Sequence, residues 1–227
     1  MKLMDIRAYF ENRYAEHPGY GKQGFLKMDI LIKMVGFGNT VLDFGSFEGT
    51  IAKRIQDAGN RVFAADAVFS ALCLAKKKIG TVIQIPFSPP YPFKDKIFDV
   101  VFIAEVIEHI LDTDGFLLEV KRIVKDDGFI IITTPNVASL GRRIMLLCGI
   151  NPYLEFSLST KMSNPGIGHI RYFTKNTLFE LLGANGFEIL EFKSDVVSLS
   201  RKGFYSRRLA RFFPTLGRSL MVKCKKI

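Results

Sequence analysis

Short apolar runs alternate with stretches of helical periodicity along most of the chain. Seven short runs rich in apolar and β-branched residues predict strands, over residues 39–45, 61–66, 81–85, 98–104, 129–134, 187–194 and 219–226. Apolar residues at helical spacing predict the helices between them, over residues 50–59, 70–78, 114–125 and 174–186. Strands without a polar face, alternating with helices, favour an α/β fold with a doubly wound, mostly parallel sheet.

Local signals mark where these helices begin and end. Thr174 is the expected N-cap of the last helix. Asp127 and Gly128 are expected to close the helix over 114–125, whose apolar positions we interpret as core.

The pattern also divides the chain into parts. We expect a helical N-terminal arm at residues 1–36 and a main domain at residues 37–227, with a hinge-like HPGYG at 17–21 in the arm. The stretch 135–170, with an expected helix near 138–148, is too long for a simple connection, so we interpret it as an inserted lid. Residues 195–227 form a basic C-terminal segment.

Charge and composition narrow the choice of partners. The net charge is +10, and residues 193–227 hold ten Lys or Arg against Asp195 alone, which is +9. Residues 201–226 could therefore contact RNA or an anionic surface. The alternative is a helix that packs Phe204, Leu209 and Phe212 on the domain and leaves its arginines in water.

Targeting and metal signals are weak. The charged N-terminus and the lack of any apolar run of about 18 residues predict neither a signal peptide nor a spanning helix, so we expect a cytoplasmic protein. The three cysteines are far apart, which suits a reducing compartment and predicts no metal site.

The chemistry-bearing residues follow the first two strands. In VLDFGSFEG (41–49), Asp43 ends a strand, Gly45 opens a turn and Gly49 begins a helix. Phe47 breaks the register of a dinucleotide fingerprint, and the acidic residue suits an ammonium group better than a pyrophosphate. Asp66, at the next strand end, is placed to accept hydrogen bonds from a ribose diol. A nucleoside with an amino-acid tail meets both requirements, whereas a nicotinamide-dependent oxidoreductase is disfavoured.

Five segments together resemble the class I S-adenosylmethionine-dependent methyltransferases, in the broad group related to the ubiquinone-biosynthesis enzymes. They cover roughly residues 37–195: LDFGSFEG (42–49), AADAVFSAL (64–72), PFKDKIFDVVFIAEVIEHI (92–110), LLEVKRIVKDDGFIIITTPN (117–136) and HIRYFTKNTLFELLGANGFEI (169–189). The resemblance implies a seven-stranded sheet of that family, with the last strand antiparallel.

The resemblance also implies a set of residues that bind S-adenosylmethionine. Those expected at the methionine end are Asp43, Gly45, Ser46 and Gly49. Asp66 is expected on the ribose, Ala67 and Val68 beside the adenine, and Ala104 and Glu105 at the fourth strand end. The chain departs from the family at Phe47, which replaces a glycine, and at Gln84, which stands where an acidic residue often meets the adenine.

The candidate catalytic residues are His109 and His169, because histidine titrates near neutral pH and an oxygen acceptor needs a base. Each also has a structural interpretation: His109 as a loop or helix-cap residue, His169 as a hydrogen-bonding residue. Arg142, Arg143 and Arg171 could meet an anionic acceptor or lie in solvent.

The stretch Ser88-Pro89-Pro90-Tyr91 spells a signature of enzymes that methylate the amines of nucleic-acid bases. It follows the third predicted strand and not the fourth, so we interpret it as a proline-stiffened connection in place of a helix, with Tyr91 bordering the adenine side.

We therefore predict a methyltransferase that uses S-adenosylmethionine on a small or medium-sized molecule, with an oxygen acceptor slightly favoured. The alternatives are an RNA methyltransferase that docks through the basic segment, and a non-catalytic S-adenosylmethionine-binding protein.

Overall fold

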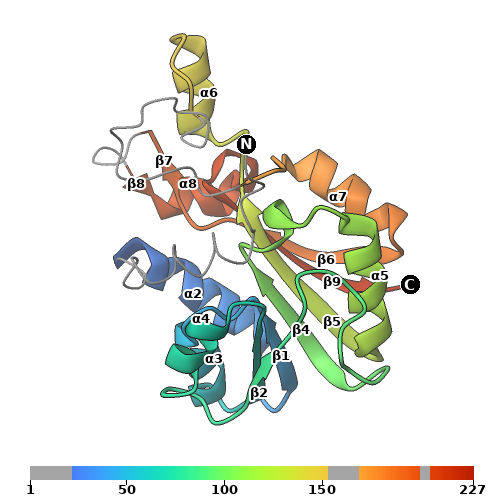
Figure 1. The fold of residues 1–227 in the computed structure, drawn as a ribbon. Helices are drawn as coiled ribbons and strands as arrows, with labels where there is room; N and C mark the ends of the chain where they lie inside the picture. The colour runs from blue at the N-terminus through green and yellow to red at the C-terminus, as the bar shows by residue number, and fades with distance from the viewer. Residues whose placement is uncertain (1–21, 153–168, 200–204) are drawn as a thin grey trace, which may run out of the picture. The chain divides into compact units, whose positions relative to one another are not determined.

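The computed structural model describes residues 22–152, 169–199 and 205–227 (Figure 1). The predictions that concern residues 1–21, 153–168 and 200–204 lie outside the described residues. They include the hinge-like stretch at 17–21, the part of the expected lid at 153–168, and Phe204.

A seven-stranded sheet organises the chain, with the strand order β3-β2-β1-β4-β5-β9-β6. It is mostly parallel, and its last strand is antiparallel, as predicted. The strands are β1 (Thr40–Phe44), β2 (Arg61–Asp66), β3 (Val82–Gln84), β4 (Phe98–Ala104), β5 (Val124–Pro135), β6 (Phe187–Lys193) and β9 (Ser219–Lys226). The predicted α/β class and all seven predicted strands are confirmed.

The helices and the smaller elements connect these strands. The helices are α2 (Lys22–Val35), α3 (Thr50–Asp57), α4 (Phe69–Ala75), α5 (Thr113–Ile123), α6 (Leu140–Leu147), α7 (Lys175–Ala184) and α8 (Arg207–Phe212). The smaller elements are the 3₁₀ turns η1 (Ile107–His109) and η3 (Pro214–Leu216) and a two-stranded sheet of β7 (Val197–Ser198) and β8 (Tyr205–Ser206). No helix in the described residues is long and apolar enough to cross a membrane.

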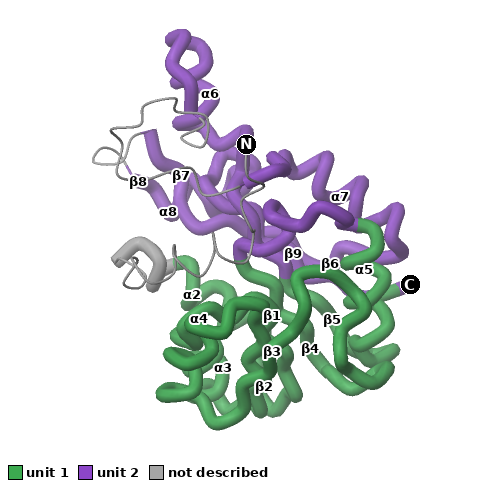
Figure 2. The backbone as a smooth tube through the Cα atoms, in the orientation of Figure 1, with its two compact units in different colours: residues 1–104, 114–131, 226 green, residues 105–113, 132–225, 227 purple. Residues whose placement is uncertain are grey.

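The chain forms two compact units, which Figure 2 shows in different colours. Unit 1 comprises residues 1–104, 114–131 and 226, and unit 2 comprises residues 105–113, 132–225 and 227. The strand β5 begins in unit 1 and ends in unit 2. The residues expected to bind the nucleoside belong mainly to unit 1, and both candidate histidines belong to unit 2.

The core of unit 1 lies around β1 and β4, which pair in parallel. Val41 and Leu42 of β1 are fully buried, as are the four residues of β4 from Val100 to Ile103. β1 also pairs with β2, and the register sets Asp43 opposite Ala64. Because both strands are buried and parallel, their carboxyl ends reach the same edge of the sheet, where Asp43 and Asp66 stand.

Thr174 is the N-cap of α7, as predicted. Its side chain accepts a hydrogen bond from the backbone N–H of Thr177, 3.2 Å away, and the Thr177 hydroxyl completes a capping box.

The predicted end of the helix over 114–125 was wrong. α5 ends at Ile123, and β5 already begins at Val124, so Asp127 and Gly128 lie inside a strand. Gly128 is needed there because a Cβ atom would stand 2.8 Å from the carbonyl oxygen of Asp99. Gly128 therefore allows β5 to lie close to the start of β4. In the sequence, a glycine required by this long-range contact looks the same as a glycine that ends a helix.

The connection between β3 and β4 contains no helix, as the prolines predicted. Tyr91 within it is 4% exposed, and its ring packs edge-on against Phe44 and Phe116, with centroids 4.9 and 6.2 Å away. Its backbone N–H donates to Glu119. Tyr91 is thus a core residue.

The strands β7 and β8 were not predicted, whereas α8 lies where a helix was one of the two alternatives. Ala210 of α8 is buried and Leu209 is half-buried, but Phe212 is 74% exposed. The interpretation that Phe212 packs on the domain was therefore wrong, because the short helix turns Leu209 and Ala210 inward and Phe212 outward.

Candidate functional site

The loop after β1 gathers several of the predicted residues in unit 1. Gly45 has a φ of 75°, which an L-residue adopts only with strain, so the chain turns sharply at this point. The backbone N–H groups of Gly45 and Ser46 both donate to the carbonyl oxygen of Ala65, at 2.8 and 2.9 Å. These bonds fix the loop against the end of β2.

Asp43 is the buried acid of this loop, with 2% of its surface exposed. Burial, together with the neighbouring charge of Asp66, raises its pKa to about 7, against a backbone hydrogen bond from Ala52 that lowers it. Within the described residues, Asp43 Oδ2 and Ser46 Oγ are buried without a hydrogen-bond partner. Buried polar atoms are rarely left unsatisfied, so this pair is suited to receive donor groups from a ligand, above all a cationic one.

Asp66 has a positioning role that the sequence analysis missed. Its Oδ2 accepts from the backbone N–H of Phe47 at 2.8 Å, and its Oδ1 accepts from that of Val68 at 2.9 Å. Asp66 therefore joins the loop after β1 to the start of α4. A carboxylate oxygen can accept more than one hydrogen bond, so these two contacts do not by themselves exclude a ligand diol.

Phe47 and Gly49 both have left-handed backbone conformations, with φ values of 50° and 74°. Phe47 thus takes up the strained conformation that the family's glycine would adopt freely. Gly49 also packs closely on α4, since a Cβ atom there would lie 2.9 Å from the Cβ of Ala75. The loop is held in shape by packing and strain as well as by hydrogen bonds.

A hollow of about 380 Å³ lies beside the end of β3, and its lining includes two of the residues predicted for the adenine. It is lined by Ala67, Gln84, Ile85, Pro86 and Phe87. Val68 is 2% exposed and does not line it. A larger hollow of about 470 Å³ between α2 and α3 contains none of the predicted site residues.

Glu105 begins unit 2 directly after Ala104, which ends β4. Glu105 has a φ of 56°, donates from its backbone N–H to the carbonyl of Thr133 at 2.8 Å, and accepts from the Thr133 hydroxyl at 3.1 Å. Both of these contacts are made to one residue of β5. They hold Glu105 in its strained backbone conformation and fix the position of its carboxylate.

The two candidate histidines are brought together in unit 2. The rings of His109 and His169 have centroids 4.8 Å apart, tilted by 59°. His169 Nε2 lies 3.9 Å from Oε1 of Glu108, which is 1% exposed. Glu108 Oε2 accepts from the hydroxyl of Thr134 at 2.9 Å. A buried carboxylate, fixed on one side by a hydroxyl, thus faces an imidazole.

The backbone holds His169 in place. The N–H groups of Ile170 and Arg171 both donate to the carbonyl of Glu108, at 3.0 and 3.2 Å. The Arg171 guanidinium donates to the carbonyls of Ile110 and Leu111, so it anchors the segment and its role in meeting an acceptor is not tested.

The sequence analysis missed Glu108. One ligand atom each from Glu108, His109 and His169 lies within 4.8 Å of the others. A carboxylate and two imidazoles are also common cation ligands, so the cluster could hold a proton or a divalent cation. The sequence does show an acidic residue directly before His109. No local pattern, however, indicates that this residue lies next to His169, which is distant in the chain.

Comparisons with known proteins agree on one family. A family model described as a methyltransferase domain matches residues 20–191. A ubiquinone biosynthesis O-methyltransferase of Rickettsia typhi is 27% identical over 165 residues, which are 71% of this chain and 65% of that protein. A probable S-adenosylmethionine-dependent methyltransferase of Mycolicibacterium smegmatis is 30% identical over 155 residues, 67% of this chain and 53% of that one. The chain thus spans about half to two thirds of these curated relatives.

Two solved structures share the fold. A chain from the complex of the Haloferax volcanii Trm112 methyltransferase activator with a methyltransferase has a TM-score of 0.69 at 17% identity, covering 98% of this chain and 97% of that one. The 1,6-didemethyltoxoflavin-N1-methyltransferase of Burkholderia thailandensis, with bound S-adenosylhomocysteine, has a TM-score of 0.66 at 18% identity, covering 97% and 87%.

Proposed function

Because the chain belongs to the class I S-adenosylmethionine-dependent methyltransferases, we propose that it transfers a methyl group from S-adenosylmethionine to an oxygen atom of a small molecule. The family match covers residues 20–191, which include every residue proposed for donor binding and both candidate histidines.

The observation that carries the proposal is the buried polar pair in the loop after β1. Asp43 Oδ2 and Ser46 Oγ lack a partner among the described residues, and Asp43 is almost fully buried. An ammonium group pairs with such a carboxylate and repays the cost of its burial. The amino-acid end of the donor carries this group, so the residues fit the donor.

The remaining donor contacts follow from the same edge of the sheet. Asp66 stands at the end of β2, where its carboxylate is assigned to the ribose hydroxyls, and its amide contacts keep the loop in place. The hollow beside Ala67 and Gln84 has room for the adenine. The bound donor supplies an activated methyl group, and the protein contributes binding and orientation.

The acceptor side is assigned to the histidine cluster of unit 2. An oxygen nucleophile must lose a proton, and an imidazole next to a buried carboxylate is suited to take it. Glu108 faces His169 and would stabilise its protonated form, while Thr134 holds Glu108 in position. The His109 ring lies next to the His169 ring, tilted by 59°. The oxygen acceptor is further supported by the named activity of the Rickettsia relatives, which are O-methyltransferases.

Calorimetry tests the donor assignment directly. S-adenosylhomocysteine should bind and NAD should not. Since Asp66 also positions the loop, loss of binding in Asp66→Ala alone would not prove a ribose contact. The sharper test compares S-adenosylhomocysteine with its 2′,3′-dideoxy analogue in the wild type and in Asp66→Asn. If Asp66 binds the diol, the wild type discriminates by roughly tenfold to a hundredfold and the variant much less. Equal discrimination by both proteins contradicts the assignment.

A screen of small-molecule acceptors, with the release of S-adenosylhomocysteine as the readout, tests for turnover. His109→Ala and His169→Ala should lower kcat by roughly a hundredfold and leave donor affinity unchanged. A loss of activity in EDTA that Mg²⁺ restores would assign the cluster to a metal ion in place of a proton acceptor. Donor binding without release against any acceptor would favour a non-catalytic binding protein, and turnover on RNA alone would contradict a small-molecule acceptor.

A further inference from the structure

Exposed arginines and large apolar side chains gather on two short helices of unit 2, α6 and α8, which both contact the strand β7. We name these exposed side chains together the basic apolar surface. Its members from α8 and the residue after it are Arg207, Arg208, Arg211, Phe212 and Phe213, and its members from α6 and the turn after it are Ile144, Leu146, Leu147 and Ile150. Phe212 is 74% exposed and Leu147 is 87% exposed, values typical of a side chain with no packing partner.

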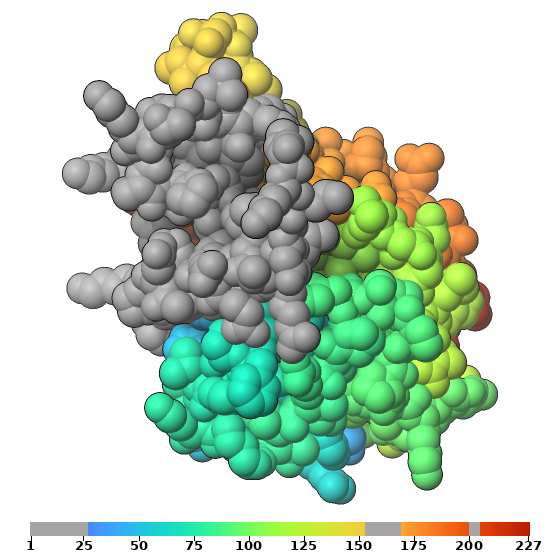
Figure 3. All heavy atoms as spheres, viewed as in Figure 1, coloured from blue at the N-terminus to red at the C-terminus, as the bar shows by residue number. Residues whose placement is uncertain are grey.

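Both helices are anchored on the small sheet of unit 2, next to which Figure 1 draws them. Gly141 of α6 approaches β7 so closely that a Cβ atom would stand 2.6 Å from the carbonyl oxygen of Ser198. α8 is capped by Ser206 of β8, whose hydroxyl accepts from Leu209, and it buries Ala210. With these faces fixed inward, the exposed side chains of both short helices include Leu146 and Leu147 of α6 and Arg208, Arg211 and Phe212 of α8. Figure 3 shows α6, in yellow, at the surface.

The charge of this region is uncompensated. Residues 136–152 and 196–227 contain no Asp or Glu. Much of the rest of the C-terminal charge is paired, since Lys193 bonds Glu191 and Lys225 bonds Glu188. None of the three α8 arginines forms an ion pair with another described residue. Within the described residues, the fold thus separates the positive charge of this segment into lysines of the large sheet that form ion pairs and arginines of α8 that form none.

We infer that the basic apolar surface binds an anionic lipid membrane in the plane of its headgroups. Guanidinium groups pair with lipid phosphates, and phenylalanine and leucine enter the boundary with the acyl chains. A nucleic acid would also attract the arginines, but it offers no environment for the aliphatic residues of α6. Exposed apolar side chains gathered in this way mark an interaction surface more often than a solvent surface. The proposal does not depend on the reaction that the chain catalyses.

The test is sedimentation of the full chain with vesicles of phosphatidylcholine, alone or with about 30% phosphatidylglycerol, at low salt. The chain should bind the anionic vesicles and not the neutral ones. Raising the salt to about 0.5 M should weaken the binding, because it shortens the range of the electrostatic attraction.

Two variants separate the two contributions. Replacing Arg207, Arg208 and Arg211 by Gln should weaken binding by about fivefold for each arginine, or on the order of a hundredfold together. Replacing Phe212 and Phe213 by Ser should remove the binding that persists at high salt, since that part rests on buried apolar area.

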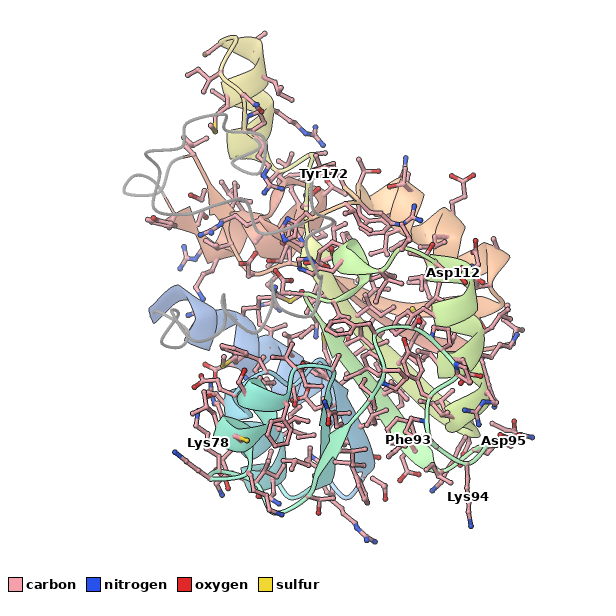
Figure 4. The ribbon with its side chains drawn as sticks, viewed as in Figure 1. Lys78, Phe93, Lys94, Asp95, Asp112 and Tyr172 are labelled. Carbon is pink, nitrogen blue, oxygen red and sulfur yellow. The ribbon has the colours of Figure 1, made fainter. Side chains whose placement is uncertain are left out.

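The matched control removes three charges elsewhere, with Lys76, Lys77 and Lys94 replaced by Gln. These lysines are exposed and belong to unit 1, and Figure 4 shows Lys94 at the periphery. If the inference is correct, this control binds vesicles nearly as tightly as the wild type does, whereas Arg→Lys at the three α8 positions restores most of the binding that Arg→Gln loses. Thermal unfolding confirms that each variant is folded.

Three results would overturn the inference. They are no binding to anionic vesicles at low salt, equal losses in the control and the arginine variant, or retention on RNA that the Phe→Ser variant leaves intact while vesicle binding is absent. The last result would assign the arginines to a nucleic acid.

Discussion

At the scale of single residues, two features of the loop after β1 lower the stability of the ligand-free protein. Asp43 is buried with one carboxylate oxygen unsatisfied among the described residues, and Phe47 occupies a left-handed conformation. Neither feature helps the ligand-free chain to fold. Such destabilising features are typical of binding sites, where the bound ligand compensates for them. A substitution that removes one should therefore raise the stability of the ligand-free protein and lower its affinity for the ligand.

Asp43→Asn should stabilise the ligand-free protein at alkaline pH and weaken donor binding. The folded-state pKa of Asp43 is raised from 3.8 to about 7. The folded protein therefore holds this proton more tightly than the unfolded chain does, and the stability contribution is full below pH 3.8 and is lost as the pH rises to about 7. Asparagine has no charge to lose, so the gain in unfolding free energy should reach about 2–4 kcal/mol at pH 8 and vanish near pH 4.

Urea unfolding of both proteins at several pH values measures this difference, and calorimetry with S-adenosylhomocysteine measures the loss in affinity, expected to be about tenfold to a hundredfold. Asp57→Asn, which changes an exposed acid paired with Lys53, is the control and should change neither quantity appreciably. If the Asp43→Asn variant were less stable than the wild type at pH 8, the cost assigned to this carboxylate would be refuted.

At the scale of elements, tight contacts between backbone segments set the positions of the strand ends. Gly49 lets α3 begin against α4, and Gly128 lets β5 pass the start of β4. Asn136, after β5, donates to the carbonyls of Thr215 and Gly217 and accepts from the N–H of Ala138. The loop and strand ends that carry the candidate site are therefore held in part by residues outside it, such as Gly128 and Asn136.

Gly49→Ala should destabilise the protein by about 2–4 kcal/mol, because the alanine must both adopt a left-handed conformation and overlap Ala75. Gly38 is the matched comparison, since its φ of 75° is nearly the same and nothing lies within 4 Å of its added Cβ. Gly38→Ala should cost only about 1–2 kcal/mol. Chemical denaturation compares the two, and equal costs would show that the contact with α4 contributes nothing.

At the scale of the whole molecule, a ligand bound only by the folded chain must raise its stability. S-adenosylhomocysteine at about one hundred times its dissociation constant should add about 2.7 kcal/mol, which for a chain of this size raises Tm by about 5–10 °C. Differential scanning fluorimetry measures the shift. It should be absent with NAD and strongly reduced in Asp43→Asn, and a rise in Tm of the same size with NAD would contradict the donor assignment.

Much of the fold was predictable because its signals are local. Runs rich in apolar and β-branched residues are a local signal for strands, so the limits of β2, β4 and β9 were predicted to the residue. The turn residues after β1 and the acid at the end of β2 have a fixed spacing, so the sequence also predicted which residues lie at that edge of the sheet. Asp99 has a structural role, since it accepts from the N–H of Thr40 and pairs with Lys125.

What the sequence determined by itself is the α/β architecture and the candidate donor residues, since periodicity and turn chemistry act over a few neighbouring positions. Only the tertiary structure decided that Asp66 bonds the amides of Phe47 and Val68, and that Glu108 lies between Thr134 and His169. It also decided that α8 buries Ala210 and leaves its arginines and Phe212 outside. These relations join residues distant in the chain or depend on which face of a helix finds a neighbour, and no local pattern encodes either.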